Sequence, residues 1–152
     1  MRHARPLFAV LSAPELYDYL DEPPPESEAA LARRYQRLES RQSPDGEESW
    51  LNWVIAIRET GELVGYVQAT VRGSSAHVAY VLARSHWGRG LASEATAAMI
   101  EALRAQLAVT TFRASVDARN ARSLQLLARL GFARRAPSAE EASRDIELQL
   151  TP

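Results

Sequence analysis

The amino-acid sequence predicts an α/β protein of the α+β type, in which helices flank a mixed, mostly antiparallel sheet. Two observations lead to this prediction. The middle of the chain contains three β-rich runs separated only by turns, which is typical of an antiparallel meander. A strand, a glycine-containing loop, a helix and a further strand then follow, as in a βαβ unit. We find no internal repeat, so we expect a single domain over residues 1–152.

The first forty residues predict helices. Apolar side chains recur there at near-helical spacing: Leu7, Phe8, Leu11, Leu16, Tyr19 and Leu20. Ser12 is the predicted cap of a new helix that has Pro14 in its first turn. The run Pro23–Pro25 interrupts the helical pattern, and Ser27 is expected to cap a second helix. The apolar side of that helix consists of Leu31, Tyr35 and Leu38.

The rest of the chain alternates between strand and helix patterns after a polar loop at 40–49. We expect strands at 53–57, 63–71, 76–83, 111–117 and 145–150, and helices at 91–107 and 121–130. Gly131 follows the last helix, where a left-handed residue without a Cβ commonly ends a helix.

Composition excludes several classes of protein. With 46% hydrophobic and 24% charged residues, the chain is typical of a globular domain, and no apolar run approaches the ~18 residues that span a bilayer. The absence of cysteine excludes a disulfide framework and a catalytic thiol. A net charge of −1 argues against nucleic acid or an anionic membrane as a partner. We therefore expect a cytoplasmic protein, and the sequence leaves open whether it forms a homodimer.

The chemical centre that the sequence predicts is the glycine loop, residues 86–92, which links the strand at 76–83 to a helix. Gly88 and Gly90 let the backbone come close to a ligand. The next helix offers unpaired N–H groups and the positive end of its dipole, so the arrangement suits a pyrophosphate. A tight turn that binds nothing has the same pattern and remains an alternative.

Two other nucleotide-binding folds also place glycines at such a turn. In a dinucleotide-binding Rossmann fold, Asp117 would stand where a ribose-binding acid is expected. However, Ser93 takes the third small position of that fingerprint, and an antiparallel meander precedes the loop. A P-loop is excluded because no Gly-Lys-Ser/Thr follows.

A longer motif surrounds the glycine loop. The run VAYVLARSHWGRGLASEA, residues 78–95, resembles the acetyl-CoA motif Gln/Arg-x-x-Gly-x-Gly/Ala of the GNAT superfamily of N-acetyltransferases. The first, fourth and sixth places of the motif are taken by Trp87, Gly90 and Ala92. The Trp-Gly-Arg-Gly form is similar to the branch that acetylates the N-terminal amines of ribosomal proteins. A second block, DARNARS at 117–123 followed by LGF at 130–132, resembles the Asn-x-x-Ser…Leu-Gly-Phe element of the same family.

The resemblance implies a GNAT fold and a place for acetyl-CoA. In this fold the strands at 76–83 and 111–117 splay apart, and the pantetheine arm pairs with the backbone in the gap. The pyrophosphate sits on the amides after the glycines, while Asn120 binds the pantetheine and Ser123 lies near the sulfur. The cofactor-binding residues implied are Tyr80, Val81, Leu82, Trp87, Gly88, Arg89, Gly90, Leu91, Ala92, Ser93, Asn120 and Ser123. Further candidates for the nucleotide phosphates are Arg119 and Arg122.

The chain also departs from the family pattern at three places. The first strand that usually precedes the first helix is missing. Leu127 stands where many members carry a tyrosine that protonates the leaving thiolate, so Ser123 is the remaining candidate for that proton donor. His77 stands where the resembled branch often has a glutamate.

Acetyl transfer needs a neutral amine, and an N-terminal amine with a pKa near 8 is roughly 10% neutral at pH 7. A base or a water chain must take the proton, and histidine is the side chain best suited to this near neutral pH. We therefore predict that His77 is the catalytic base, although an ordinary half-exposed strand histidine has the same pattern. We expect no metal ion, because His3 and His86 have no partners at metal-ligand spacing.

The resemblance implies an acetyl-CoA-dependent N-acetyltransferase, an acyltransferase that acts by direct attack of a primary amine in a ternary complex. The acceptor is a small molecule or a protein N-terminus. A CoA-binding module with little or no catalysis, in a regulatory or interaction role, is the alternative. Aromatic residues expected either on the acceptor side of the cleft or in the core are Tyr17, Tyr19, Trp50 and Trp53.

Overall fold

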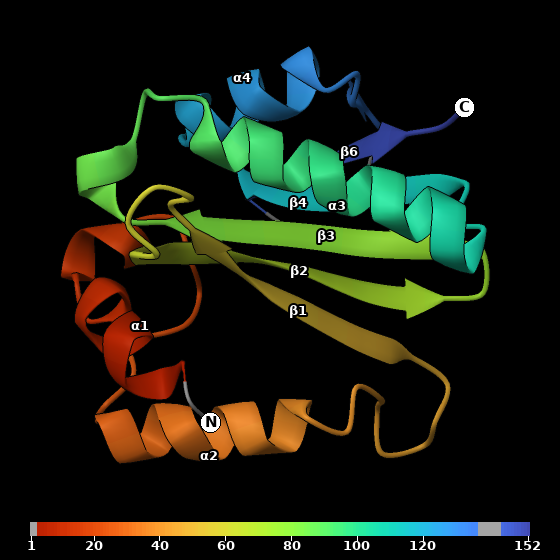
Figure 1. Cartoon of the computed structure of the whole chain (residues 1–152). Coiled ribbons are helices and arrows are strands. Elements are labelled where there is room, and N and C mark those ends of the chain that lie inside the picture. Colours follow the sequence, from red (N-terminus) through yellow and green to blue (C-terminus); the bar gives the residue numbers. More distant parts are fainter. Residues whose placement is uncertain (1–2, 137–143) are drawn as a thin grey trace.

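The structure, a computed structural model, describes residues 3–136 and 144–152 (Figure 1). Within these residues a six-stranded sheet has the order β1-β2-β3-β4-β6-β5. The strands are β1 (Ser49–Ala56), β2 (Leu63–Arg72), β3 (Ser75–Leu82), β4 (Thr111–Asp117), β5 (Ala133–Arg134) and β6 (Asp145–Leu150). The helices are α1 (Ala4–Leu11), α2 (Glu28–Leu38), α3 (Leu91–Leu107) and α4 (Ala121–Arg129), with short 3₁₀ turns η1 (Pro14–Tyr17) and η2 (Arg84–His86). In the described ranges no helix is both long enough and apolar enough to cross a bilayer.

Helices cover the two faces of the sheet unequally. On one face, α3 and α4 bury Met99, Leu103 and Leu127 against a large apolar core that includes Phe112. Figure 1 shows α3 lying along β3 and β4, while α1 and α2 are grouped on the other side of the meander. Residues of α1 and α2 form a smaller core with side chains of the opposite face: Ala4, Leu7, Leu11, Leu31, Val54, Tyr66 and Val81.

The two faces of β3 follow the alternation of its sequence. Val78 and Leu82 belong to the large core, whereas Val81 packs against the smaller one. Side chains of a strand point alternately to opposite faces, so His77, Ala79 and Val81 share the face on which α1 and α2 lie. This confirms the predicted assignment of the two faces.

The sheet opens between β3 and β4, as the GNAT resemblance implies. All strand pairs except this one are antiparallel. The parallel β3–β4 ladder covers only the pairs Ser75–Thr111, Ala76–Phe112 and His77–Arg113, although β3 continues to Leu82 and β4 to Asp117. The expected mixed, mostly antiparallel sheet with a splay at this point is therefore confirmed. We call the gap beyond the last pair, between residues 78–82 and 114–117, the wedge.

Two local predictions were wrong. Ser12 does not cap the helix that follows, because its hydroxyl donates to the Phe8 carbonyl at 2.6 Å and so belongs to the end of α1. Ala13 precedes η1 instead, and it provides no side-chain cap. The first strand was expected at 53–57 but begins at Ser49, since the residues from Ser49 to Ile55 pair with β2 in one continuous register. By contrast, Ser27 caps α2 as predicted, accepting from the Ala30 N–H at 3.1 Å.

Candidate functional site

The wedge exposes backbone groups of β3. Beyond His77 no strand within residues 3–136 and 144–152 pairs with the β4 side of β3, so groups there are open to another extended, amide-bearing chain. At the far end, the Leu82 carbonyl accepts a hydrogen bond from the Trp87 indole N–H at 2.8 Å. The Ala83 N–H turns away to the Val64 carbonyl of β2, at 2.7 Å. The glycine loop therefore bounds the open end of the wedge, which is the end farthest from the last β3–β4 pair.

The glycine loop has the backbone that an anion site requires. Gly88 has φ +75° and Gly90 has φ +76°, in the left-handed region that favours glycine. A Cβ at either position would meet no protein atom within 4 Å, so packing against the chain does not explain these glycines. Gly90 is the residue before α3, a helix of 17 residues whose first N–H groups have no partner within the helix. The loop thus combines free N–H donors, a helix dipole and open space, which fit a pyrophosphate.

An aromatic–arginine contact joins the glycine loop to α4. The Arg122 guanidinium lies 4.2 Å from the centre of the Trp87 ring, and that of Arg84 lies 5.9 Å from it. Such cation–π contacts stabilise by about 0.5–1 kcal/mol where solvent reaches them. Trp87 therefore connects the β3 end of the wedge, through the Leu82 carbonyl, with α4, through Arg122.

The turn between β4 and α4 is held by its own side chains. The Asp117 carboxylate accepts from the Arg119 backbone N–H at 2.8 Å, from Nε at 2.9 Å and from Nη2 at 2.7 Å. These hydrogen bonds from Arg119 lower the pKa of Asp117 to about 2. Asn120 caps α4, since its Oδ1 accepts from the Ser123 N–H at 3.1 Å. Arg119, one of the three arginines considered for the phosphates, is thus engaged with Asp117.

Ser123 and Tyr80 meet beside the wedge. The Tyr80 hydroxyl donates to the Ser123 carbonyl at 3.4 Å, which brings a side chain of β3 to the first turn of α4. Burial raises the pKa of Tyr80, so its hydroxyl keeps its proton. The Ser123 hydroxyl makes no hydrogen bond to the described part of the chain. Sequence reasoning missed the Tyr80 side chain and considered only its backbone, although strand alternation already placed it on the face of Val78 and Leu82.

His77 stands at the closed end of the wedge, in the last β3–β4 pair. Its side chain is exposed, and Nε2 lies 3.0 Å from the Ser115 hydroxyl oxygen of β4. This contact bridges the two strands where their backbones begin to separate. Ser115 was not predicted, because a contact between residues 38 positions apart depends on the register of the parallel pair.

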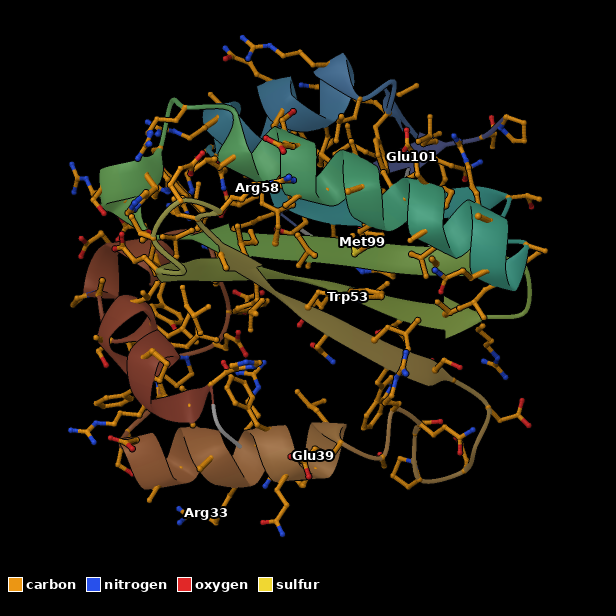
Figure 2. All side chains as sticks on the ribbon, viewed as in Figure 1. Arg33, Glu39, Trp53, Arg58, Met99 and Glu101 are labelled. Atoms are coloured by element: carbon orange, nitrogen blue, oxygen red, sulfur yellow. The ribbon has the colours of Figure 1, made fainter. Side chains whose placement is uncertain are left out.

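A cavity of about 800 Å³ opens on the same sheet face as His77, between α1, α2 and the strands β1 and β2. We call it the sheet-face cavity. It is lined by His3, Leu7, Leu11, Leu31, Arg34, Tyr35, Leu38, Glu39, Arg41, Trp50, Asn52, Trp53, Val54, Tyr66 and Gln68. Figure 2 labels two of these residues, Glu39 at the end of α2 and Trp53 on β1.

The register of the sheet connects this cavity to the wedge. Gln68 pairs with Ala79, and Tyr66 pairs with Val81, so both cavity residues lie beside the strand that edges the wedge. Directly opposed residues of an antiparallel pair share a face and lie about 5 Å apart. A molecule that contacts Tyr66 or Gln68 in the cavity is therefore only one strand spacing away from β3.

Of the four aromatic residues considered for the acceptor side, two line the cavity. These are Trp50 and Trp53. The Tyr17 hydroxyl instead donates to the Leu11 carbonyl at 2.8 Å, and the Tyr19 ring lies under the Arg119 guanidinium at 5.7 Å. Sequence reasoning missed Asn52, Tyr66 and Gln68, which carry no motif. Tyr66 and Gln68 belong to the strand predicted at 63–71, whereas Asn52 lies just before the strand predicted at 53–57.

Comparison with known families gives a match over most of the chain. Residues 1–133 match the acetyltransferase (GNAT) domain family. An uncharacterized N-acetyltransferase, p20, of Bacillus licheniformis is 29% identical over 124 residues, which cover 80% of this chain and 68% of that protein.

Solved structures share the fold at low sequence identity. An acetyltransferase of the GNAT family from Bacillus anthracis superposes with a TM-score of 0.81 at 13% identity, covering 99% of this chain and 89% of that one. A spermidine N-acetyltransferase from Vibrio cholerae, in complex with CoA and spermine, gives 0.76 at 18% identity, with 97% and 88% covered. A ribosomal-protein-S5-alanine acetyltransferase from Vibrio fischeri gives 0.76 at 16% identity, with 99% and 88% covered.

Proposed function

The chain belongs to the GNAT acetyltransferase family, whose members use acetyl-CoA as the acetyl donor, and from that premise we propose that it acetylates a primary amine. The amine attacks the thioester directly while both substrates are bound. The observation that carries this proposal is the arrangement around β3. The wedge and the glycine loop follow one another along β3, and the sheet-face cavity lies beside the same strand on the face of His77.

The chain's own groups suit each part of acetyl-CoA. When bound, acetyl-CoA supplies an acetyl thioester that is open to an amine nucleophile. The unpaired edge of β3 along Tyr80, Val81 and Leu82 offers hydrogen bonds to the amides of a pantetheine arm. The groups that face the wedge are those of Tyr80 and Leu82, because backbone groups alternate sides and the Ala83 N–H already faces β2. The glycine loop offers the N–H groups of Leu91, Ala92 and Ser93 to a pyrophosphate, with Arg89 exposed beside them. Asn120 uses only its carbonyl oxygen in the cap, so its amide N–H₂ is left to donate to the same arm.

Two proton transfers accompany the reaction. We assign the removal of the amine proton to His77, directly or through a water, because it is exposed and lies on the face of the cavity. The contact with Ser115 orients the imidazole across the closed end of the wedge. We assign protonation of the departing sulfur to Ser123 or to a water that it holds, with the proton replaced from solvent. The Tyr80 hydroxyl lies beside it, through its hydrogen bond to the Ser123 carbonyl. Backbone N–H groups near Leu82 stabilise the charge that develops on the acetyl oxygen.

Within the family, we place the chain nearest the branch that acetylates N-terminal amines of ribosomal proteins. The Trp-Gly-Arg-Gly form of the glycine loop supports this placement. The likeness to the S5-alanine acetyltransferase extends over 99% of the chain, and at 16% identity it supports the fold rather than the branch.

A CoA-binding module with little catalysis is the second candidate. It is favoured by Leu127, which is fully buried in the large core and has no proton to donate. The two candidates differ in turnover but share acetyl-CoA binding. An enzyme must release CoA in the presence of an amine, whereas a binding module does not.

A ligand-dependent melting experiment tests the binding step. Acetyl-CoA at about 100 times its Kd should stabilise the fold by ~2.7 kcal/mol, which raises the Tm of a domain of this size by about 5–10 °C. NAD at the same concentration should leave the Tm unchanged. Stabilisation by NAD and not by acetyl-CoA would contradict the proposal.

The proton donor is tested by Ser123→Ala. We expect a loss of about tenfold in kcat with little change in acetyl-CoA affinity, because a CoA thiol is a fair leaving group even without help. The substitution removes no hydrogen bond within the described chain, so stability should hold. Tyr80→Phe is the matched variant, and the double variant shows whether the two hydroxyls act on the same step. A fall in affinity at unchanged kcat would make Ser123 a cofactor contact only.

A further inference from the structure

The walls of the sheet-face cavity are mainly apolar. Leucines of α1 and α2 form one side, and aromatic rings form part of the other. Apolar and aromatic residues on these walls include Leu7, Leu11, Leu31, Leu38, Trp50 and Tyr66. A volume of about 800 Å³ with such walls suits a small organic molecule whose body is apolar.

The charges around the cavity do not favour a polycation. Among the described residues that line it, Glu39 is the acidic side chain, while Arg34 and Arg41 are cationic. The Arg34 guanidinium lies 3.4 Å from a Glu22 carboxylate oxygen, so that nearby acid is already paired. A ligand with several ammonium groups would therefore meet at least as much positive as negative charge, and like charges in contact cost binding energy.

Two neutral amides form part of the cavity floor. Asn52 of β1 and Gln68 of β2 pair directly across the antiparallel ladder. Neither carboxamide makes a hydrogen bond to the described part of the chain, and together they present both donors and acceptors to the cavity. This is a complement to a neutral polar group of a ligand, such as an amide.

A row of paired residues crosses β1, β2 and β3, and it determines the order in which the parts of a ligand lie along the cavity. Asn52 pairs with Gln68, and Gln68 pairs with Ala79 of β3, so the row runs from β1 to the edge of the wedge. Neighbouring strands lie about 4.8 Å apart. A ligand whose amine reaches β3 therefore has its next polar group over Gln68 and its apolar body toward α1 and α2.

We propose that the acceptor is a monoamine with an apolar body and a neutral amide next to the amine, and that polyamines and aminoglycosides are poor acceptors. The proposal rests on the proposed acetyl transfer and specifies the class of its second substrate. A free amino-acid amide and the first residue of a peptide share this chemistry.

The test compares acceptors in a steady-state assay of CoA release by the full chain. Phenylalanine amide should exceed spermidine and kanamycin by about 100-fold in kcat/KM. Phenethylamine, which lacks the amide, should be about tenfold poorer than phenylalanine amide, the value of about one hydrogen bond. A tetrapeptide that begins with phenylalanine shows whether a chain is accepted as well as the free amide. Preference for spermidine or kanamycin over both phenylalanine acceptors would overturn the proposal.

The variant Gln68→Leu distinguishes a loss of recognition of the ligand's amide from general damage to the cavity. It should raise KM for phenylalanine amide about tenfold, leave kcat unchanged and have little effect on phenethylamine. Gln149→Leu, a change of the same chemistry on β6 outside the cavity, should alter neither substrate. An equal loss for both substrates in Gln68→Leu would overturn the assignment of the amide site.

Calorimetry keeps the two proposals apart. If acetyl-CoA does not bind, the proposed function fails. If acetyl-CoA binds but no amine is acetylated, binding of phenylalanine amide and of spermidine to the CoA complex is measured directly. Tighter binding of phenylalanine amide then supports the acceptor class, and tighter binding of spermidine overturns it.

Discussion

Replacement of Gly90 by valine is expected to abolish acetyl-CoA binding while the protein stays folded. Gly90 has φ +76°, a conformation that a β-branched residue strongly disfavours. A valine side chain would also project into the open space in front of the α3 N-terminus, where the pyrophosphate is proposed to lie. Both effects act on the same N–H donors. We expect the Kd for acetyl-CoA, measured by calorimetry, to rise at least 100-fold.

The matched control for this change is Gly73→Val. Gly73 also has a left-handed φ, +57°, and a Cβ there likewise meets no atom within 4 Å. It lies in the turn between β2 and β3, at the opposite end of β3 from the glycine loop. Both variants should lose stability to backbone strain, of about 1–3 kcal/mol, but the control should bind acetyl-CoA normally. A wild-type Kd in the Gly90 variant would move the cofactor away from this loop.

Much of the fold could be predicted because its signals are local. Alternating residues predicted β2, β3 and β4, and the helical spacing of apolar residues predicted α3. Gly131 has φ +91° after α4, as the steric argument for a left-handed residue requires. Each of these signals lies within one element, so no knowledge of a partner is needed.

The incorrect or missing predictions concern residues whose structure depends on the group to which they hydrogen-bond. Ser12 looks like a cap from its sequence position, but its hydroxyl binds the carbonyl four residues back, a competing interaction open to any serine in a helix. β1 begins before its apolar pattern does, because Ser49 pairs with Val71 of β2. The two-residue strand β5 was not predicted, since it has no pattern of its own and exists through pairing with β6.

The candidate site likewise has parts that local sequence motifs predict and parts that depend on how distant elements pack together. The glycine loop and the Asn120–Ser123 turn are contiguous motifs, and their glycine φ values and capping geometry have the form the motifs indicate. The sheet-face cavity is assembled from α1, α2, β1 and β2, and its residues share no spacing along the chain. The contact between His77 and Ser115 likewise needs the β3–β4 register, which no local pattern contains.

Replacement of His77 by alanine is expected to lower kcat by about 10²–10⁴, the usual contribution of a general base. His77 is exposed at the closed end of the wedge, and its side chain shares a face with the cavity where the amine is proposed to bind. Acetyl-CoA affinity should not change, because His77 precedes the open backbone of β3.

Two further variants separate base catalysis from a structural role of the contact with Ser115. His77→Gln keeps a side chain that can hydrogen-bond to Ser115 but cannot take a proton, so it should be as slow as the alanine variant. Ser115→Ala keeps the imidazole and loses only its orientation, so we expect a smaller loss, about tenfold in kcat. If His77→Gln instead restores the wild-type rate, the histidine only supports the strand pair. A water held on the open face near Gln68 and Ala79 would then take the amine proton.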